Sequence, residues 1–474
     1  MKSTLNFSLI NLWCTKNLVD SQYFLGRLFD MSLKTPEIQL NYFTDPFDKK
    51  ATIVFLNTCG FISSARDEAN ETVKKLLKAG KTVYLMGCAV QYYKKFQGQG
   101  KRDKDHGPHP MPHIPELHYL SRGDLNKVNL KQILQWYDSK SYGDFEFASS
   151  PRVYTNIEQK FEYLKIAEWC DNHCTFCIIP AIRGKQQSLP MEKILDEAKQ
   201  MIANGIQEII LIAQDTTRYG SDLYGEPKLL ELLKKLDKLK WNFSYRLLYL
   251  YPDIVTLNQI KELKTLKKFI PYFDIPLQHI SSPVLKKMGR FYDESAIKKF
   301  LDQIKDSFPI RFIRTNLIIG FPGETKEDFE KLMKFVNKTK FDNIALFEYH
   351  DESMAASSKL PNKVDDSEIR ARFTKIRQLV NRQLLEREAA RKGKEEVGYI
   401  VDVETKKRWN EKTKKNIVWA FERLSVSSLI VRPRLHCPEI DDVDEIGMEQ
   451  VRWVFEEKNE LEIGDKIVYL KKRA

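Results

Sequence analysis

Six of the seven cysteines in this chain form two groups of three that could hold iron. Cys170, Cys174 and Cys177 follow the spacing C-x3-C-x2-C, and we call them the compact triad. Three thiolates at this spacing can bind three irons of a 4Fe–4S cluster and leave the fourth iron open for chemistry. Cys14, Cys59 and Cys88 make up the second group, the dispersed triad. Two such triads predict an enzyme with two clusters.

A zinc site is the main alternative for the compact triad, and a metal-free loop is the other. Structural zinc normally has four protein ligands, commonly as two pairs of cysteines. No second pair lies near this loop, and the spacing makes His173 an awkward fourth ligand. The pattern therefore favours an iron–sulfur cluster.

The dispersed triad follows three strand-like runs. Residues 7–13, 52–57 and 82–86 are apolar or rich in β-formers, and one cysteine comes just after each run. We expect helices at 17–31 and, from a capping-box-like start at Ser64 and Asp67, through residue 78. Ligand sites of open α/β sheets collect at the carboxyl ends of the strands. This placement favours metal ligands over the alternative of three buried structural thiols.

From residue 161 the pattern alternates strand and helix. We predict strands at 163–167, 208–213, 244–250, 272–275, 312–319 and 343–347, with helices between them, such as 192–203 and 326–339. Six β/α units indicate a partial barrel rather than a full eight-stranded one. Polar residues follow the strands, among them Gln214, Gln278 and the run Gly320-Phe-Pro-Gly-Glu. Because barrel active sites form at that end, these residues should face one cavity beside the compact triad.

The remaining segments complete an α/β chain of three predicted domains, at 1–150, 151–390 and 391–474. Residues 366–392 indicate a charged helix, and strand-like runs at 397–403, 417–420, 428–431 and 466–470 predict a small C-terminal β-barrel. We expect Cys437 in that region to be a packing residue. The breaker-rich stretch 97–115 predicts a solvated loop. The alternative is a metal site formed by the histidines in this stretch and just after it, namely His106, His109, His113 and His118.

Composition limits the partners and the compartment. The net charge of +12 favours an acidic or ribonucleoprotein partner, although a lysine-rich proteome would have the same effect. From residue 394 onward 16 Lys and Arg face 17 Asp and Glu, so the excess lies upstream. No apolar run reaches the roughly 18 residues of a membrane helix. The first residues show no signal-peptide cleavage site, so we expect a cytoplasmic protein that keeps its cysteines reduced.

The sequence C-x3-C-x-aromatic-C after a first barrel strand resembles the radical S-adenosylmethionine superfamily. The resemblance implies that the open iron binds S-adenosylmethionine, whose reductive cleavage gives a deoxyadenosyl radical. It also implies cofactor contacts from Phe176, Gln214, Gln278 and Gly320. Loop packing for Phe176, and a helix-start turn capped by Thr325 for Gly320, are the structural alternatives.

Runs that include Asn57-Thr-Cys-Gly, Cys177-Ile-Ile-Pro and Ala213-Gln-Asp-Thr narrow the resemblance to the methylthiotransferases of the RimO type. That type implies two 4Fe–4S clusters, an external electron donor and a C-terminal TRAM module. Its substrate is the β-carbon of an aspartate in a small-subunit ribosomal protein. The tRNA-modifying MiaB type is the alternative, and contact with RNA or the ribosome is compatible with either. This chain departs from the type at Trp13, where glycine is usual, and at Gln187-Ser-Leu-Pro190.

Overall fold

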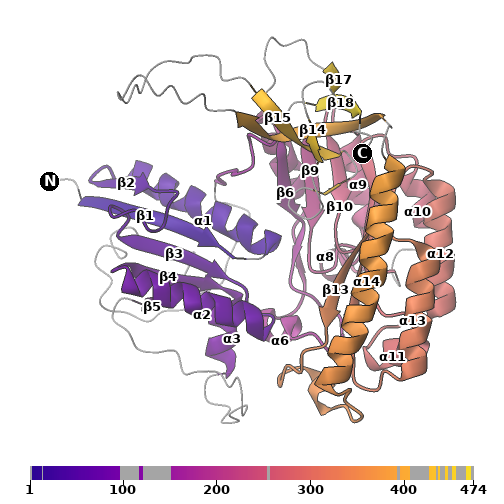
Figure 1. The fold of residues 1–474 in the computed structure, drawn as a ribbon. Helices are drawn as coiled ribbons and strands as arrows, with labels where there is room; N and C mark the ends of the chain where they lie inside the picture. The colour runs from indigo at the N-terminus through magenta and orange to yellow at the C-terminus, as the bar shows by residue number, and fades with distance from the viewer. Residues whose placement is uncertain are drawn as a thin grey trace, which may run out of the picture.

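The computed structural model describes residues 3–12, 14–96, 117–120, 151–252, 257–391, 395–405, 426–433, 436–437, 444–446, 451–454 and 466–470. These residues form three large sheets and one short two-stranded ribbon. The first sheet lies beside the second, and the third lies above both in the view of Figure 1.

The N-terminal sheet is parallel, in the order β2-β1-β3-β4-β5. Its strands are β1 (Ser3–Asn11), β2 (Ile38–Tyr42), β3 (Ile53–Thr58), β4 (Thr82–Gly87) and β5 (Leu117–Leu120). The three predicted strands are confirmed, whereas β2 and β5 were not predicted. Helix α1 (Thr15–Lys34) covers one face of the sheet, where its Phe24 packs in one cluster with Phe55 of β3. Helices α2 (Ser63–Lys78) and α3 (Cys88–Phe96) cover the other face. Burial on both faces explains why the central strands β3 and β4 are mostly apolar.

The predicted capping box at the start of α2 is wrong. The N-cap residue is Ile62, and no local side chain caps the helix. Instead, Glu352, from a distant part of the chain, contacts the start of the helix. The Ser63 amide donates to Glu352 Oε1 at 2.7 Å, and Arg66 pairs with Glu352 Oε2 at 2.8 Å. A carboxylate at a helix N-terminus accepts hydrogen bonds from free amides and interacts favourably with the helix dipole. This tertiary contact therefore takes the place of a local cap.

The second sheet has six parallel strands in the order β13-β12-β11-β10-β9-β6, and it stays open, as expected of a partial barrel. Its strands are β6 (Phe161–Lys165), β9 (Glu208–Ile212), β10 (Ser244–Leu247), β11 (Phe269–Gln278), β12 (Phe312–Ile319) and β13 (Asn343–Glu348). All six strand predictions are confirmed to within a few residues. The ribbon of β7 (Ala167–Glu168) and β8 (Gln187–Ser188) flanks the cysteine loop.

Helices cover the outer face of this sheet with one continuous apolar core. They are α7 (Met191–Ala203), α9 (Leu229–Asp237), α10 (Leu257–Leu263), α12 (Glu294–Ser307) and α13 (Lys326–Thr339). Short helices α6 (Ile179–Arg183), α8 (Ser221–Tyr224), α11 (Ser282–Lys287) and η2 (Ala356–Lys359) lie in the connecting loops. The inner face packs against Val19 and Tyr23 of α1, so the first helix of the chain helps to fill the open barrel. Cys437 is fully buried in the same cluster, which confirms a packing role.

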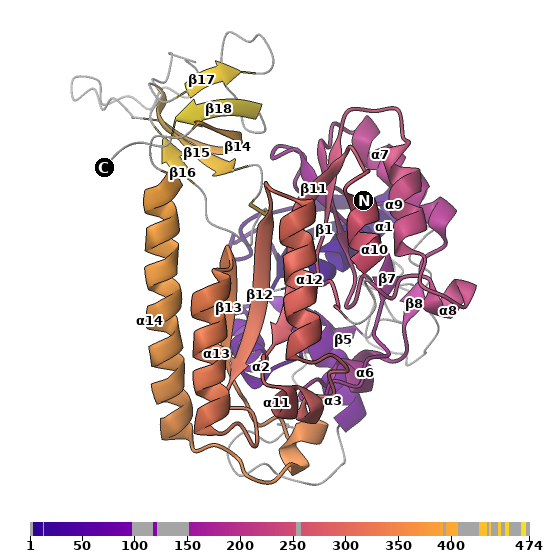
Figure 2. The same cartoon turned by 90° about the vertical axis from the view of Figure 1, so that its right-hand side faces the viewer.

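Helix α14 (Asp366–Arg391) runs alongside α13 and leads to the third sheet, which both views place at its far end (Figures 1 and 2). That sheet is antiparallel, in the order β16-β15-β14-β18-β17. Its strands are β14 (Glu395–Thr405), β15 (Val426–Pro433), β16 (Asp444–Ile446), β17 (Val451–Val454) and β18 (Lys466–Leu470). The predicted strand at 417–420 lies outside the described residues, and the barrel-like TRAM module remains a prediction.

The stretch 97–115, with His106, His109 and His113, also lies outside the described residues. His118 belongs to β5, where its ring stacks on Tyr84 with centroids 4.6 Å apart. Within the part of the chain that the structure describes, no helix is long and apolar enough to cross a membrane.

Candidate functional site

The compact triad lies on a loop that neighbouring elements hold by backbone contacts. Thr175, between two of the cysteines, donates its amide to Met288 O at 3.0 Å and accepts from the Ser357 amide at 2.8 Å. Asn172 Nδ2 donates to Asp215 Oδ2 at 2.7 Å, which ties the loop to the end of β9. Gly289 has φ +72°, and a Cβ there would lie 2.4 Å from His173 O. The loop is therefore fixed before any ligand binds.

Burial disfavours the thiolate forms of Cys170 and Cys177 in the metal-free protein. Burial raises the pKa of Cys170 to about 11 and that of Cys177 to about 12. Iron must displace these protons, because thiolates are the ligands of a cluster. His173 is exposed, and none of the described residues, these cysteines included, forms a three-ligand site for a single metal ion.

The predicted S-adenosylmethionine contacts lie around this loop. Phe176 packs edge-on against Phe321 at 6.5 Å, and the Arg290 guanidinium lies 5.6 Å from the Phe176 ring. Gln214 follows β9, and Gln278 ends β11 with a left-handed φ of +69°. Gly320, at φ +81°, leaves space that Ile369 of α14 fills, since a Cβ would lie 2.3 Å from Ile369 Cγ1. Thr325 caps α13 in a full capping box, as the structural alternative for that turn expects.

Several polar atoms near the loop suit a polar cofactor. Gln214 Oε1 is buried, and so are Arg290 Nε and Nη1, and none of these atoms has a hydrogen-bond partner among the described residues. Leaving such groups unsatisfied costs about 1–3 kcal/mol each. S-adenosylmethionine has amino, carboxylate and hydroxyl groups that could satisfy them. The residues present therefore fit that cofactor beside a cluster on the compact triad.

The dispersed triad lies where β1, β3 and β4 end side by side. These strands are adjacent, with Asn11 opposite Asn57 and Thr58 opposite Gly87, so the residues after them meet at one edge. Gly60, the residue after Cys59, packs against the backbone of Cys88, because a Cβ on Gly60 would lie 2.7 Å from the Cys88 carbonyl. Burial, with the nearby Cys88 and Cys14 sulfurs, raises the pKa of Cys59 to about 12. The fold thus brings the three distant cysteines together.

Arg183, from the helix that follows the compact triad, contacts the dispersed triad. It ends α6, six residues after Cys177, and its Nε and Nη2 donate to Cys88 Sγ at 3.1 and 2.6 Å. Nη2 also donates to Asn17 Oδ1 at 2.7 Å, and Nη1 lies 3.4 Å from Glu168 Oε2. Burial opposes the charge of Arg183, but the neighbouring Cys88 and Glu168 outweigh it and hold its pKa well above the usual value. No role was predicted for Arg183 from the sequence, although it lies within a run that resembles the family.

Comparison with known proteins identifies the family. Residues 164–336 match the Radical SAM superfamily, and residues 6–105 match the Uncharacterized protein family UPF0004. The chain is 39% identical over 394 residues to a protein of Alkaliphilus oremlandii named "Ribosomal protein uS12 methylthiotransferase RimO", covering 81% of this chain and 84% of the relative. A protein of the same name from Carboxydothermus hydrogenoformans is 37% identical, covering 78% of this chain and 81% of the relative.

The chain belongs to the RimO family. Membership supports an iron–sulfur cluster and S-adenosylmethionine as cofactors, and it favours the RimO type over the tRNA-modifying alternative. Among solved structures, TsrM of Kitasatospora setae, a radical S-adenosylmethionine methyltransferase with a [4Fe-4S] cluster bound, is 12% identical with a TM-score of 0.46. That alignment covers 73% of this chain and 72% of TsrM.

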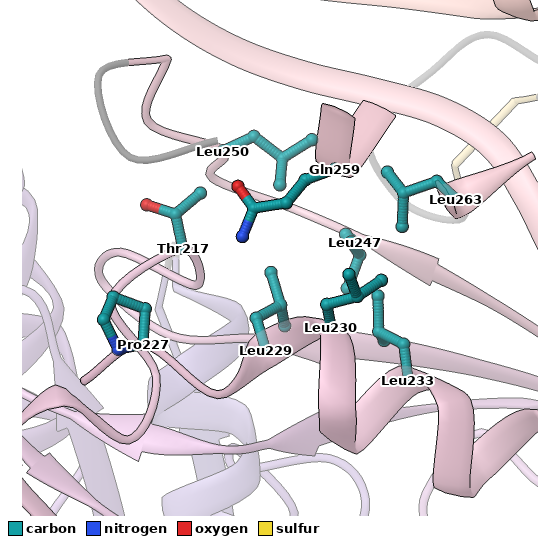
Figure 3. A pocket seen from close by; sticks show the side chains of 9 residues that line it. All are labelled: Thr217, Pro227, Leu229, Leu230, Leu233, Leu247, Leu250, Gln259 and Leu263. Carbon is teal, nitrogen blue, oxygen red and sulfur yellow. The ribbon is translucent and has the colours of Figure 1, made fainter. Parts of the chain in front are cut away.

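A pocket lies between α9, β10 and α10, and none of the six triad cysteines lines it (Figure 3). Six leucines dominate its lining, with Thr217 and Gln259 as the polar members; the lining residues are Thr217, Pro227, Leu229, Leu230, Leu233, Leu247, Leu250, Gln259 and Leu263. It contains no ionisable side chain, so it offers no acid–base or metal chemistry.

Proposed function

We propose that this protein is a radical S-adenosylmethionine methylthiotransferase that modifies the β-carbon of an aspartate in ribosomal protein uS12. The observation that supports this most is the linkage of the two cysteine triads through Arg183. Arg183 ends the short helix that follows the loop of the compact triad, and it contacts the sulfur of Cys88 in the dispersed triad. An enzyme that forms a radical at one centre and delivers sulfur from another needs the two centres fixed to each other.

The proposed chemistry explains why two centres are needed. The β C–H bond of aspartate is too weakly acidic for a side-chain base at neutral pH, so removal of a hydrogen atom replaces proton transfer. A cluster on the compact triad, with S-adenosylmethionine bound, would supply the radical that takes this hydrogen. Phe176, Gln214, Gln278 and Gly320 would position that cofactor. Cys14, Cys59 and Cys88 would hold the second cluster, which presents the sulfur.

We extend the proposal to the parts of the chain around this centre. The segments 1–150, 151–390 and 391–474 would act as a sulfur-delivering domain, a radical domain and a TRAM-like substrate-docking module. An external electron donor would supply the reducing electron, and the reaction would take place in the cytoplasm. Contact with ribosomal RNA would accompany capture of the substrate if uS12 is modified in its ribosomal setting.

The test compares two triple variants of the reconstituted enzyme. Alanine in place of the dispersed triad should abolish methylthiolation of uS12 but preserve reductive cleavage of S-adenosylmethionine. Alanine in place of the compact triad should abolish both. Mass spectrometry of uS12 and chromatography of 5′-deoxyadenosine measure the two reactions. Methylthiolated uS12 from the dispersed-triad variant would make those cysteines structural, and methylthiolated tRNA with unmodified uS12 would favour the tRNA-modifying alternative.

A further inference from the structure

Arg290 is a buried arginine beside the loop of the compact triad. It follows α11, is 7% exposed, and forms no ion pair with any carboxylate of the described residues. A hydrogen bond with Tyr251 leaves its Nε and Nη1 atoms buried and without a partner in the part of the chain that the structure describes. Buried donors of a charged group are costly to leave unsatisfied, so these two atoms need an acceptor that the metal-free protein does not supply.

The backbone before Arg290 packs against the cysteine loop and so fixes where the guanidinium lies. Gly289 approaches the loop so closely that a Cβ there would lie 2.4 Å from His173 O. The guanidinium carbon of the next residue lies 5.6 Å from the centroid of the Phe176 ring and 4.4 Å from that of the Tyr251 ring. Because Phe176 stands between two cysteines of the compact triad, the charge of Arg290 lies at the triad itself.

The neighbours that stabilise the charge of Arg290 include a sulfur of the compact triad. Burial opposes this charge, but the neighbouring Tyr292, Cys174 and Tyr251 outweigh burial and raise the pKa of the guanidinium. Tyrosine hydroxyls are neutral near neutral pH, so Cys174 is the one of these three that becomes negative when it binds iron. The interaction is mutual: burial raises the pKa of Cys177 to about 12, and the charge of Arg290 is one of the influences that oppose this rise.

We infer that Arg290 is the counter-charge of the compact triad, where it donates to the sulfur of a cluster and favours the reduced state of that cluster. The inference rests on the proposed function, because that function assigns a cluster to these cysteines. A 4Fe–4S cluster on three thiolates is anionic, and one electron from the external donor makes it more so. Its potential depends on net charge and on hydrogen bonds to sulfur, and a buried cation supplies both. Arg290 stays protonated throughout, so it changes the potential without transferring a proton.

The experiment isolates the compact triad in the full-length chain by replacing the dispersed triad with alanine. In this parent, Arg290→Met and Arg290→Gln remove the charge, Arg290→Lys retains it, and Arg377→Met is the matched control. Arg377 is an exposed arginine of α14, so its loss should change nothing. Each protein is reconstituted with iron and sulfide, and electron paramagnetic resonance measures the reduced fraction at fixed potentials, first without S-adenosylmethionine and then with it. Iron analysis and circular dichroism verify that the cluster and the fold are retained.

Without S-adenosylmethionine, both neutral variants should lower the ratio of reduced to oxidised cluster by about tenfold or more at a fixed potential, which is a shift of about 59 mV for one electron. Arg290→Lys should lie between them and the parent, and Arg377→Met should match the parent. An unchanged ratio in a neutral variant that retains its iron would refute the inference. So would a shift that appears only with S-adenosylmethionine, since Arg290 would then contact that cofactor and not the cluster. A parent that takes up no cluster on the compact triad would refute the proposed function on which the inference rests.

Discussion

The clearest energetic prediction concerns Arg152, which joins α1 to the six-stranded sheet. Its guanidinium is 2% exposed and lies 3.2 Å from Glu162 and 2.6 Å from Glu197. Its Nε donates to Gln22 Oε1 of α1 at 2.9 Å. Burial opposes the charge, but the two carboxylates outweigh it and raise the pKa of Arg152. Arg152→Met would leave Glu162, which is wholly buried, and Glu197 without their cation.

Breaking a buried ion pair by removing one partner costs about 3–5 kcal/mol, because the remaining charge stays desolvated. The control is Lys34→Met, which removes a pair of 2.6 Å to Asp30 at a site where Lys34 is 72% exposed; exposed pairs contribute about 0–1 kcal/mol. Anaerobic urea denaturation of the metal-free proteins, followed by circular dichroism, should separate the two variants by at least about 2 kcal/mol.

Restoring the charge balance tests the cause. Adding Glu162→Gln to Arg152→Met should recover part of the loss, because one of the orphaned charges disappears. Looser docking of α1 should also raise the amount of S-adenosylmethionine cleaved per methylthio group formed, since Asn17 of α1 accepts a hydrogen bond from Arg183 beside the dispersed triad. If Arg152→Met and Lys34→Met had the same unfolding midpoint, the network would contribute no more than a surface pair and the reasoning would be wrong.

The triads and the C-terminal region can be tested in three more ways. Anaerobically reconstituted protein should bind about eight irons, and the compact-triad alanine variant about half of that; full iron or stoichiometric zinc in iron analysis would contradict two clusters. In that alanine background, Arg183→Met should lower the reduction potential of the remaining cluster, because hydrogen bonds and positive charge at Cys88 favour the reduced form. Redox titration should show Arg183→Lys between the two, and an unchanged potential would contradict the contact. Residues 439–445 carry five acidic side chains, which would complement a basic surface of the ribosomal protein. Reversing Asp441, Asp442 and Asp444 should therefore weaken its capture at low salt and less at high salt, which binding assays can check.

The positions of the strand ends were predictable because, in this chain, apolar strand runs are directly followed by polar residues. Runs of buried apolar residues locate parallel strands, and the polar residues after them mark the edge where sites form. The same two patterns predict that Cys14, Cys59 and Cys88 lie at one edge of the first sheet. Strand β5 was not predicted because its four residues follow a long breaker-rich stretch. Strand β2 was missed although its five residues, IQLNY, alternate between apolar and polar side chains.

The contacts between the two parallel sheets could not be predicted in the same way. Arg183 contacts Cys88, and Glu352 contacts the start of α2 at Ser63. These two pairs join residues that are 95 and 289 positions apart. Local sequence carries no signal for such partners. The capping-box prediction failed for this reason, since Ser64 and Asp67 satisfied the local pattern while Glu352 supplied the carboxylate.

Backbone strain at the end of the six-stranded sheet was equally hidden from the sequence. Trp169, Tyr249 and Gln278 have φ values of +65°, +61° and +69°. Trp169 directly precedes Cys170, and Gln278 is itself a proposed cofactor contact. Sequence patterns assign such conformations to glycine or asparagine, so no pattern predicts them at tryptophan, tyrosine or glutamine. Each costs about 1–3 kcal/mol, which the fold must offset elsewhere. Trp169 follows β7, Tyr249 lies in the loop after β10, and Gln278 is the last residue of β11. These three strained positions indicate that this end of the sheet is rigid before the cofactor and substrate bind. Rigidity there suits radical chemistry, because a reactive carbon radical must meet one hydrogen atom and no other.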